Sequence, residues 1–432
     1  MENFIECIGR FFKKENKNSP SEKRYKKLNE DEIRIIGKVQ IFRVQEICDL
    51  LGIEIPESYS NATGCFVDET DYFLSLENAE NIIRNVKIQL ASDIIEKRKR
   101  RIKRSAQKFK KNYEKCVDMD DESSVLLENF IKWLYIYFPR NYSRPDYFNY
   151  KLYDKNLEES ESFISYYYGK KIWNVCNPMN FRYICDDKSL FNQRFSKYVN
   201  RDFIKISNCT FEDFENFIVK HPRFFIKPLD SNGGRGARIH ERNNDSLDML
   251  FEQLKVENVI LEEVVRQHYD MSKFNPDSIN TIRVCTLLTA SNEPLVIYAG
   301  IRVGRKGKVV DNFAAGGMTA AIDVKTGIIY SDAMDKIGEI IELHPDSGVR
   351  FKGSKIPCWD KVLKIAKEAA LETSELRYIG WDVVINEDGE VQFIEGNTRP
   401  AFYLVQAADQ IGKKHLYEEH VNEIEKKMMN LI

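Results

Sequence analysis

Residues 380–397 read GWDVVINEDGEVQFIEGN, a pattern that predicts two short strands joined by a turn at Glu387-Asp388-Gly389. An Asp-Gly turn reverses the chain and sets the register of a hairpin, so positions on the two strands lie side by side. Asp382, Glu395 and Asn397 would then direct oxygen atoms towards one point. Such ligands suit a hard cation such as Mg2+. The competing interpretation is a surface hairpin whose acidic residues face solvent.

A second pattern lies upstream, in residues 225–237, which read FIKPLDSNGGRGA. It predicts a short apolar strand that carries Lys227, followed by a loop that contains Gly233, Gly234 and Gly236. Glycines let backbone N–H groups approach phosphate oxygens with no Cβ in the way, and a Lys at the strand end can neutralise phosphate charge. The loop matches neither the Walker A motif nor the dinucleotide-binding fingerprint. Alone, such a loop is also a common turn.

The order of these patterns resembles the ATP-grasp superfamily across about residues 185–405. In that family two Lys residues, a glycine-rich flap, an adenine-binding hinge and a late Asp…Glu-x-Asn metal motif follow one another in fixed order. The hinge-like segment here is residues 258–265, NVILEEVV. The resemblance assigns nucleotide contacts to Lys188 and Lys227, to the flap glycines Gly233, Gly234 and Gly236, and to Glu262, Glu263 and Val265 of the hinge. It assigns metal binding to Asp382, Glu395 and Asn397.

The segment between the hinge and the hairpin indicates which branch of the ATP-grasp superfamily the chain resembles. Residues 299–304 and 310–318 are similar to the Arg…Asn-x-x-x-Gly-Gly region of glutathione synthetases and ribosomal-protein glutamate ligases, where the acyl phosphate forms. Together with residues 280–284, this region most resembles ATP-grasp proteins found beside sugar-transfer and polysaccharide genes. The D-alanine–D-alanine ligases carry an Arg two positions before the metal Asp, where this chain has Gly380. Arg302 and Arg283 are therefore the candidate cations for the transferring phosphoryl group, and Asn312 is expected to line the same pocket.

The resemblance implies an α+β protein with the ATP-grasp fold, in which two α+β subdomains grip ATP, preceded by a helical N-terminal extension. It also implies an ATP-dependent ligase that joins a carboxylate, on a small molecule or a glycan, to an amine through an acyl phosphate. ATP and two Mg2+ ions are the implied cofactors, and the sugar-transfer branch suggests a sugar or polysaccharide precursor as substrate. An ATP-grasp kinase that phosphorylates a hydroxyl is the alternative. A binding module without turnover is a third reading, and the intact metal motif and both lysines argue against it.

Composition limits the remaining function classes. A chain of 432 residues with 43% apolar content can bury a large core and predicts two or three domains. The formal net charge of −2 predicts no nucleic-acid partner. Nine cysteines show no C-x-x-C pair, which argues against zinc and against a disulfide framework and indicates a reducing compartment. No membrane-spanning apolar run and no signal-peptide pattern is found, so we expect a cytoplasmic protein.

The sequence predicts that the chain divides into three regions. Residues 1–125 form a charged helical domain, whose basic run at 94–104 is read either as a contact with an anionic membrane or lipid-linked glycan, or as a solvated helix. Residues 126–185 form an aromatic-rich segment, read as core packing or as a shelf for an acceptor sugar. Residues 186–432 form the ATP-grasp domain, which includes a helix that starts at Trp359 and a C-terminal helix over 404–432.

Overall fold

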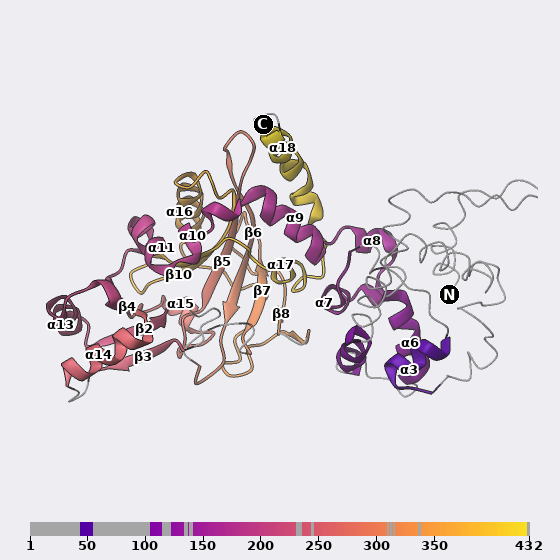
Figure 1. Cartoon of the computed structure of the whole chain (residues 1–432), viewed down its shortest axis with the longest axis horizontal. Coiled ribbons are helices and arrows are strands. Elements are labelled where there is room, and N and C mark those ends of the chain that lie inside the picture. The colour runs from indigo at the N-terminus through magenta and orange to yellow at the C-terminus, as the bar shows by residue number, and fades with distance from the viewer. Residues whose placement is uncertain are drawn as a thin grey trace, which may run out of the picture. The chain divides into compact units, whose positions relative to one another are not determined.

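The computed structural model of the chain describes residues 44–54, 104–114, 122–133, 137, 141–229, 236–242, 246–308, 311, 313, 316–335 and 338–429. These residues divide into two compact units, one made of residues 1–156 with 165–167 and the other of 157–164 with 168–432 (Figure 1). Most of the expected N-terminal helical domain and nearly all of its basic run lie outside the described residues. So do three predicted site residues: Gly233, Gly234 and Asn312. Among the described helices none is long and apolar enough to cross a membrane.

The first unit contains helices α3 (Val44–Leu51), α6 (Glu122–Lys132) and α7 (Arg144–Asn149). Helix α7 begins where Ser143 and Asp146 form a capping box, which satisfies backbone N–H groups that have no partner in the first turn. Aromatic side chains fill the interior of the first unit. The ring centroid of Phe109 lies 5.2 Å from that of Phe130 and 5.6 Å from that of Trp133. Trp133 is 2% exposed. The core-packing interpretation of the aromatic segment is confirmed for these residues.

A four-stranded antiparallel sheet forms one part of the second unit, with strand order β1-β4-β2-β3. Helices α13 and α14 pack on it through a buried cluster that includes Phe214, Phe251, Ile226 and Leu261 (Figure 1). Helix α13 begins at a second capping box, between Thr210 and Asp213. The bounds are β1 (Phe203–Lys205), β2 (Arg223–Pro228), β3 (Arg238–Glu241), β4 (Val259–Glu263), α13 (Phe211–Lys220) and α14 (Leu247–Glu257).

A seven-stranded antiparallel sheet forms the other part, with strand order β11-β10-β5-β6-β7-β8-β9. Its central strands are buried on both faces, which explains their long apolar runs. The strands are β5 (Thr281–Leu288), β6 (Pro294–Val303), β7 (Met318–Ile322), β8 (Ala333–Met334), β9 (Ile340–Ile341), β10 (Tyr378–Ile385) and β11 (Val391–Asn397). The helices of this part are α8 (Leu157–Glu161), α9 (Tyr166–Cys176), α10 (Tyr183–Asp186), α11 (Lys188–Arg194), α12 (Ser196–Val199), α15 (Tyr269–Ser272), α16 (Trp359–Leu371), α17 (Phe402–Gln406) and α18 (Glu418–Met429).

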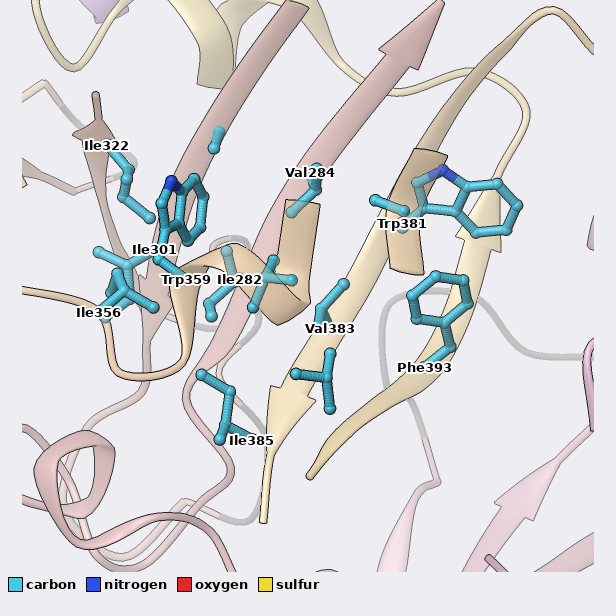
Figure 2. Packing of buried hydrophobic residues seen from close by; sticks show 14 of the residues in the cluster. Ile282, Val284, Ile301, Ile322, Ile356, Trp359, Trp381, Val383, Ile385 and Phe393 are labelled. Atoms are coloured by element: carbon cyan, nitrogen blue, oxygen red, sulfur yellow. The ribbon is translucent and has the colours of Figure 1, made fainter. Parts of the chain in front are cut away.

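Alternate residues of the central strands supply two separate cores. Helix α16 covers one face, where Trp381 and Val383 of β10 lie beside Ile282 and Val284 of β5 and the rings of Trp381 and Phe393 stack at 4.9 Å (Figure 2). The opposite face packs Leu287 and Tyr378 against α17 and α18. This two-sided covering keeps the central strands rigid. The predicted helix starting at Trp359 is confirmed as α16.

The predicted hairpin is also confirmed, with Asp382 opposite Glu395 and Gly380 opposite Asn397 in the register of β10 and β11. The single C-terminal helix expected over 404–432 is wrong. The chain instead forms α17, a 3-10 turn at Lys414–Leu416 and α18. Gln410 adopts a left-handed conformation with φ 57°. Gly412 lies so close to Ser162 that a Cβ would come within 2.4 Å of that residue's backbone. The left-handed backbone at Gln410 interrupts the helix, because a right-handed helix cannot continue through it.

Candidate functional site

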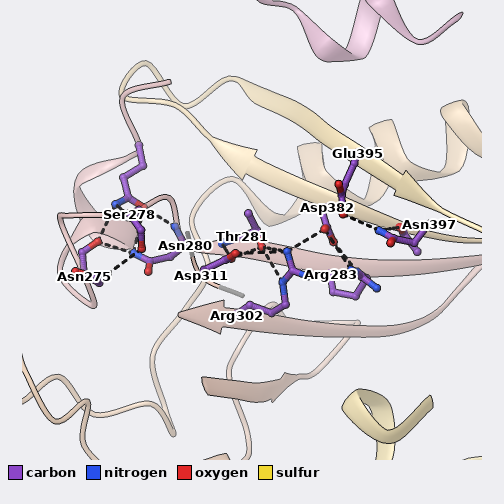
Figure 3. A network of polar contacts seen from close by, with 12 residues as sticks. Asn275, Ser278, Asn280, Thr281, Arg283, Arg302, Asp311, Asp382, Glu395 and Asn397 are labelled. Atoms are coloured by element: carbon purple, nitrogen blue, oxygen red, sulfur yellow. Dashed lines mark hydrogen bonds and ion pairs between the residues drawn. The ribbon is translucent and has the colours of Figure 1, made fainter. Parts of the chain in front are cut away.

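Asp382 lies at the centre of a buried ionic network that spans three neighbouring strands (Figure 3). Arg283 faces it directly from β5 and donates from Nε to Oδ1 at 2.5 Å and from Nη2 to Oδ2 at 3.2 Å. Arg302 of β6 donates from Nη2 to Oδ2 at 2.9 Å. Arg302 also bonds the hydroxyl of Thr281, which in turn donates to Asp311. Period-two alternation puts these side chains on one face of the sheet.

Gly380 makes room for Arg283. A Cβ built at this position would lie 3.1 Å from Arg283 Cδ and 2.8 Å from Pro400 Cβ, both closer than ordinary carbon contacts. The strand that carries the predicted metal ligand therefore presents no side chain at 380, and the guanidinium from the neighbouring strand lies there instead. The structure thus brings both sequence-predicted arginines, Arg283 and Arg302, to the carboxylate of Asp382.

Asp382 and Glu395 have opposite protonation tendencies. Burial works against charge on Asp382, but Arg283 and Arg302 outweigh it and hold the pKa of this carboxyl at about 2. Burial, together with the negative charge of Asp382, raises the pKa of Glu395. Asp382 is therefore the carboxyl that its surroundings keep ionised, and Glu395 is the one whose ionisation they disfavour.

The oxygen donors around Glu395 fit a hard divalent cation. Asn397 donates its amide N–H groups to Glu395 Oε1 and to the carbonyl of Gly380, both at 3.3 Å, which leaves the amide oxygen as an acceptor. Asp382 already accepts three N–H bonds from the two arginines, so Glu395 and Asn397 have more capacity for a cation. The residues present match the oxygen-only donor set that Mg2+ prefers.

The two predicted nucleotide lysines meet the end of β2: Lys227 belongs to this strand, and the side chain of Lys188 reaches it from α11. Lys188 opens helix α11 directly after its N-cap residue Asp187, as predicted, and its Nζ donates to the carbonyls of Pro228 and Leu229 at 2.9 and 3.0 Å. Lys227 of β2 donates to the carbonyl of Ile394 at 3.3 Å. Since Ile394 precedes Glu395 on β11, Lys227 connects the four-stranded sheet to the strand of the carboxylate pair.

The predicted hinge residues separate onto two faces of β4. Glu262 is buried beside Lys227, with Nζ–Oε1 at 3.6 Å, and receives hydrogen bonds from Arg201 and Asn192. Burial opposes its ionisation, but Arg201 and Lys227 lower the pKa of Glu262 to about 2. Glu263 points to the other face, where it accepts from the backbone N–H of Asp202 at 3.2 Å. The prediction grouped both glutamates at the nucleotide, and the structure brings only Glu262 to Lys227.

The remaining predicted residues are placed more simply. Val265 lies half-buried just beyond the end of β4. Gly236, the flap glycine within the described part of the chain, has φ 75° and would bring a Cβ to 3.0 Å from Pro228. Sequence reasoning missed Arg201, because nothing local marks a residue 61 positions from its partner Glu262. It also missed Thr281, which the alternation along β5 could have placed beside Arg283.

Residues 167–423, more than half of the chain, match the family model described as sugar-transfer associated ATP-grasp. The chain belongs to this family. This membership confirms the predicted superfamily and the α+β ATP-grasp fold. No curated protein matches the chain in sequence.

Solved ATP-grasp structures show distant likeness. The ATP-grasp ligase PsnB, complexed with minimal precursor, Mg and ADP, is 15% identical with a TM-score of 0.36, over 58% of this chain and 62% of that one. The ADP complex of PurK, an N5-carboxyaminoimidazole ribonucleotide synthetase, is 13% identical with a TM-score of 0.32, over 50% and 45%. The D-alanine–D-alanine ligase from Coxiella burnetii is 10% identical with a TM-score of 0.35, over 57% and 60%. The chain spans less than two thirds of each of these proteins.

Proposed function

We propose that this protein is an ATP-dependent carboxylate–amine ligase that acts through an acyl phosphate. The observation that carries the proposal is the Asp382–Glu395 pair, which the hairpin register holds beside two buried arginines in an ATP-grasp family member. The family's association with sugar transfer supports a sugar or polysaccharide precursor as the substrate. Such a precursor would carry the carboxylate or the amine that is joined.

The residues divide into a nucleotide group and a metal group. Lys188 and Lys227 would bind ATP phosphates together with the loop at 231–237, while Glu262 and the backbone near Val265 would face the adenine. Glu395, Asn397 and Asp382 would hold two Mg2+ ions. When bound there, Mg2+ supplies positive charge that offsets the charge on the transferring phosphoryl group.

The arginines would act on the reacting groups. In the first reaction a substrate carboxylate oxygen bonds to the γ-phosphorus and the bond to ADP breaks, which gives an acyl phosphate. In the second an amine bonds to the acyl carbon, phosphate leaves, and the amine proton passes to solvent. Arg302, with Arg283 behind it, would donate to the oxygens on which negative charge develops. Asn312, Gly316 and Gly317 would shape the pocket around them.

The metal assignment is tested with a matched pair of variants. Glu395→Gln keeps the side-chain volume but removes the charge that a cation needs, so Mg2+-dependent ATP turnover should be lost. Glu390→Gln changes a Glu of the same hairpin that pairs with Lys361 at the surface, and turnover should stay near the wild-type rate. Similar turnover by both variants would remove Glu395 from the site.

The reaction class is tested by isotope transfer. Candidate carboxylates labelled with 18O are incubated with ATP, Mg2+ and an amine, and the products are read by mass spectrometry. A ligase transfers one labelled oxygen from the carboxylate to inorganic phosphate. Its product has the combined mass of the carboxylic acid and the amine less one water. A product that gains a phosphate, with no labelled inorganic phosphate formed, would establish a kinase and overturn the proposal.

A further inference from the structure

Three potential metal ligands meet away from the nucleotide lysines. They are Asp202, which precedes β1, His221, which caps the end of α13, and Glu263, which ends β4. One ligand atom from each lies within 4.8 Å of the others. Glu263 follows Glu262 in the strand, and the two side chains leave β4 on opposite faces. The cluster is therefore separate from the candidate ATP site.

The local backbone holds these ligands in place. Asp202 and Glu263 are joined twice, since the Glu263 N–H donates to the Asp202 carbonyl at 2.9 Å and the Asp202 N–H donates to Glu263 Oε2 at 3.2 Å. The His221 ring lies 4.9 Å from the ring of Phe217, and its Nε2 lies 2.7 Å from Asp202 Oδ2. The His221 side chain is 12% exposed, so its orientation is set by packing. Ordering these groups at the moment of metal binding would cost little.

A lysine ammonium group already lies against the cluster. Lys220 places its ammonium 2.5 Å from the same Asp202 oxygen that His221 contacts. These two groups lower the pKa of the Asp202 carboxyl. One interpretation is a surface ion pair and nothing more. However, the Lys220 side chain is 68% exposed on a flexible stem, so a metal ion can displace it without disturbing the fold.

We propose that Asp202, His221 and Glu263 form a binding site for a divalent transition metal ion of the Zn2+ class. One imidazole nitrogen and two carboxylate oxygens are a mixed donor set that suits such ions better than Mg2+ or Ca2+, which prefer oxygen alone. At Zn–ligand distances of about 2.0–2.2 Å, tetrahedral ligands lie about 3.3 Å apart. The observed separations, 2.7 Å for one pair and at most 4.8 Å for the others, require only small side-chain movements. Water would complete the coordination.

The bound ion would join three elements of the four-stranded part. It would connect the start of β1, the end of α13 and the end of β4, one residue from Glu262. We therefore expect the ion to raise the melting temperature of the full-length protein, because a ligand that binds only the folded state stabilises it. This stabilisation does not depend on ATP turnover.

The test is a titration of the metal-stripped full-length protein with Co2+, followed by its visible absorption, and then by displacement with Zn2+. Wild-type protein should bind one ion at the site, with an absorption band typical of low coordination number. His221→Gln should weaken this binding at least about 10-fold, the effect expected when one of three ligands is lost. His415→Gln changes an exposed histidine outside the cluster and should leave binding unchanged.

Lys220→Met supplies a test that misfolding cannot imitate. It removes the ammonium that competes for Asp202, so Co2+ should bind more tightly, by about 10-fold for the loss of one nearby positive charge. Equal affinities in His221→Gln and His415→Gln would show binding by surface histidines and overturn the proposal. No absorption band in wild type, or weaker binding in Lys220→Met, would show that the cluster is only an ion pair.

Discussion

Replacing Arg283 with Met should destabilise the seven-stranded part markedly. The side chains of Arg283 and Asp382 are 8% and 1% exposed, and two hydrogen bonds join them. Methionine keeps a similar length and apolar stem but leaves the buried carboxylate with Arg302 as its remaining cationic partner. Removing one member of a buried ion pair costs about 3–5 kcal/mol in free energy of unfolding. Because Arg302 still donates at 2.9 Å, we expect a loss of about 3 kcal/mol.

The chain offers a matched control with the same bonding pattern near the surface. Arg305 donates from Nε and Nη2 to the two oxygens of Asp346 at 2.8 and 3.2 Å, but these side chains are 42% and 25% exposed. Arg305→Met should therefore cost at most about 1 kcal/mol. Urea unfolding followed by tryptophan fluorescence measures both, since Trp381 is fully buried beside Asp382. Equal losses in the two variants would refute the argument that burial gives the Arg283 pair its importance.

A double-mutant cycle separates the pair from its surroundings. Asp382→Asn removes the charge that Arg283 neutralises, so the combined Arg283→Met and Asp382→Asn variant should lose less stability than the sum of the two single variants. Additive losses would mean that the two side chains act independently.

Three other substitutions test features outside the pair of Arg283 and Asp382. Glu262 has its pKa lowered from 4.5 to about 2, so its ionised form stabilises the fold above pH 4.5 and this contribution, about 3 kcal/mol, is lost as pH falls towards 2. The difference in unfolding free energy between wild type and Glu262→Gln should therefore shrink between pH 5 and pH 3, and a constant difference would contradict the pairing with Arg201. Lys227→Ala should weaken ATP binding about 10- to 100-fold by calorimetry, through loss of one or two charge-assisted contacts, and unchanged affinity would remove Lys227 from the nucleotide site. Gly412→Ala should lower the unfolding free energy by about 1–3 kcal/mol, because its Cβ would overlap Ser162, and a silent substitution would show that this contact relaxes freely.

Features set by neighbouring residues could be predicted from the sequence. The pairing of Asp382 with Glu395 follows from a short turn, and the start of α11 at Lys188 follows from the capping Asp187. The separation of Glu262 from Glu263 could have been predicted too, because successive side chains of a strand alternate between faces. Local rules of this kind require no knowledge of the tertiary fold.

Features set by distant contacts could not be predicted. Arg283 and Asp382 are 99 positions apart, and only the strand order β10-β5-β6 brings them and Arg302 together. The sequence identified both arginines as candidates but gave no way to choose between them or to show that they share one carboxylate. The C-terminal stretch breaks at the left-handed Gln410, close to where Gly412 meets Ser162, and no periodicity in residues 404–432 records either feature.

The glycine at 380 also has a consequence for which substitutions this chain can accept. A Cβ at 380 would lie 2.8 Å from Pro400 Cβ and 3.1 Å from Arg283 Cδ, so a side chain at 380 requires both neighbours to shift. We therefore expect an Arg at 380 to be compatible with this site only when the side chain at 283 is shorter, and loss of Arg283 alone would leave the buried carboxylate of Asp382 with Arg302 as its cationic partner. Among relatives, substitutions at these two positions should therefore occur in pairs, and sequences that place large side chains at both should be missing. The absence of a Cβ at 380 and the presence of a long cationic side chain at 283 are thus coupled properties of two neighbouring strands.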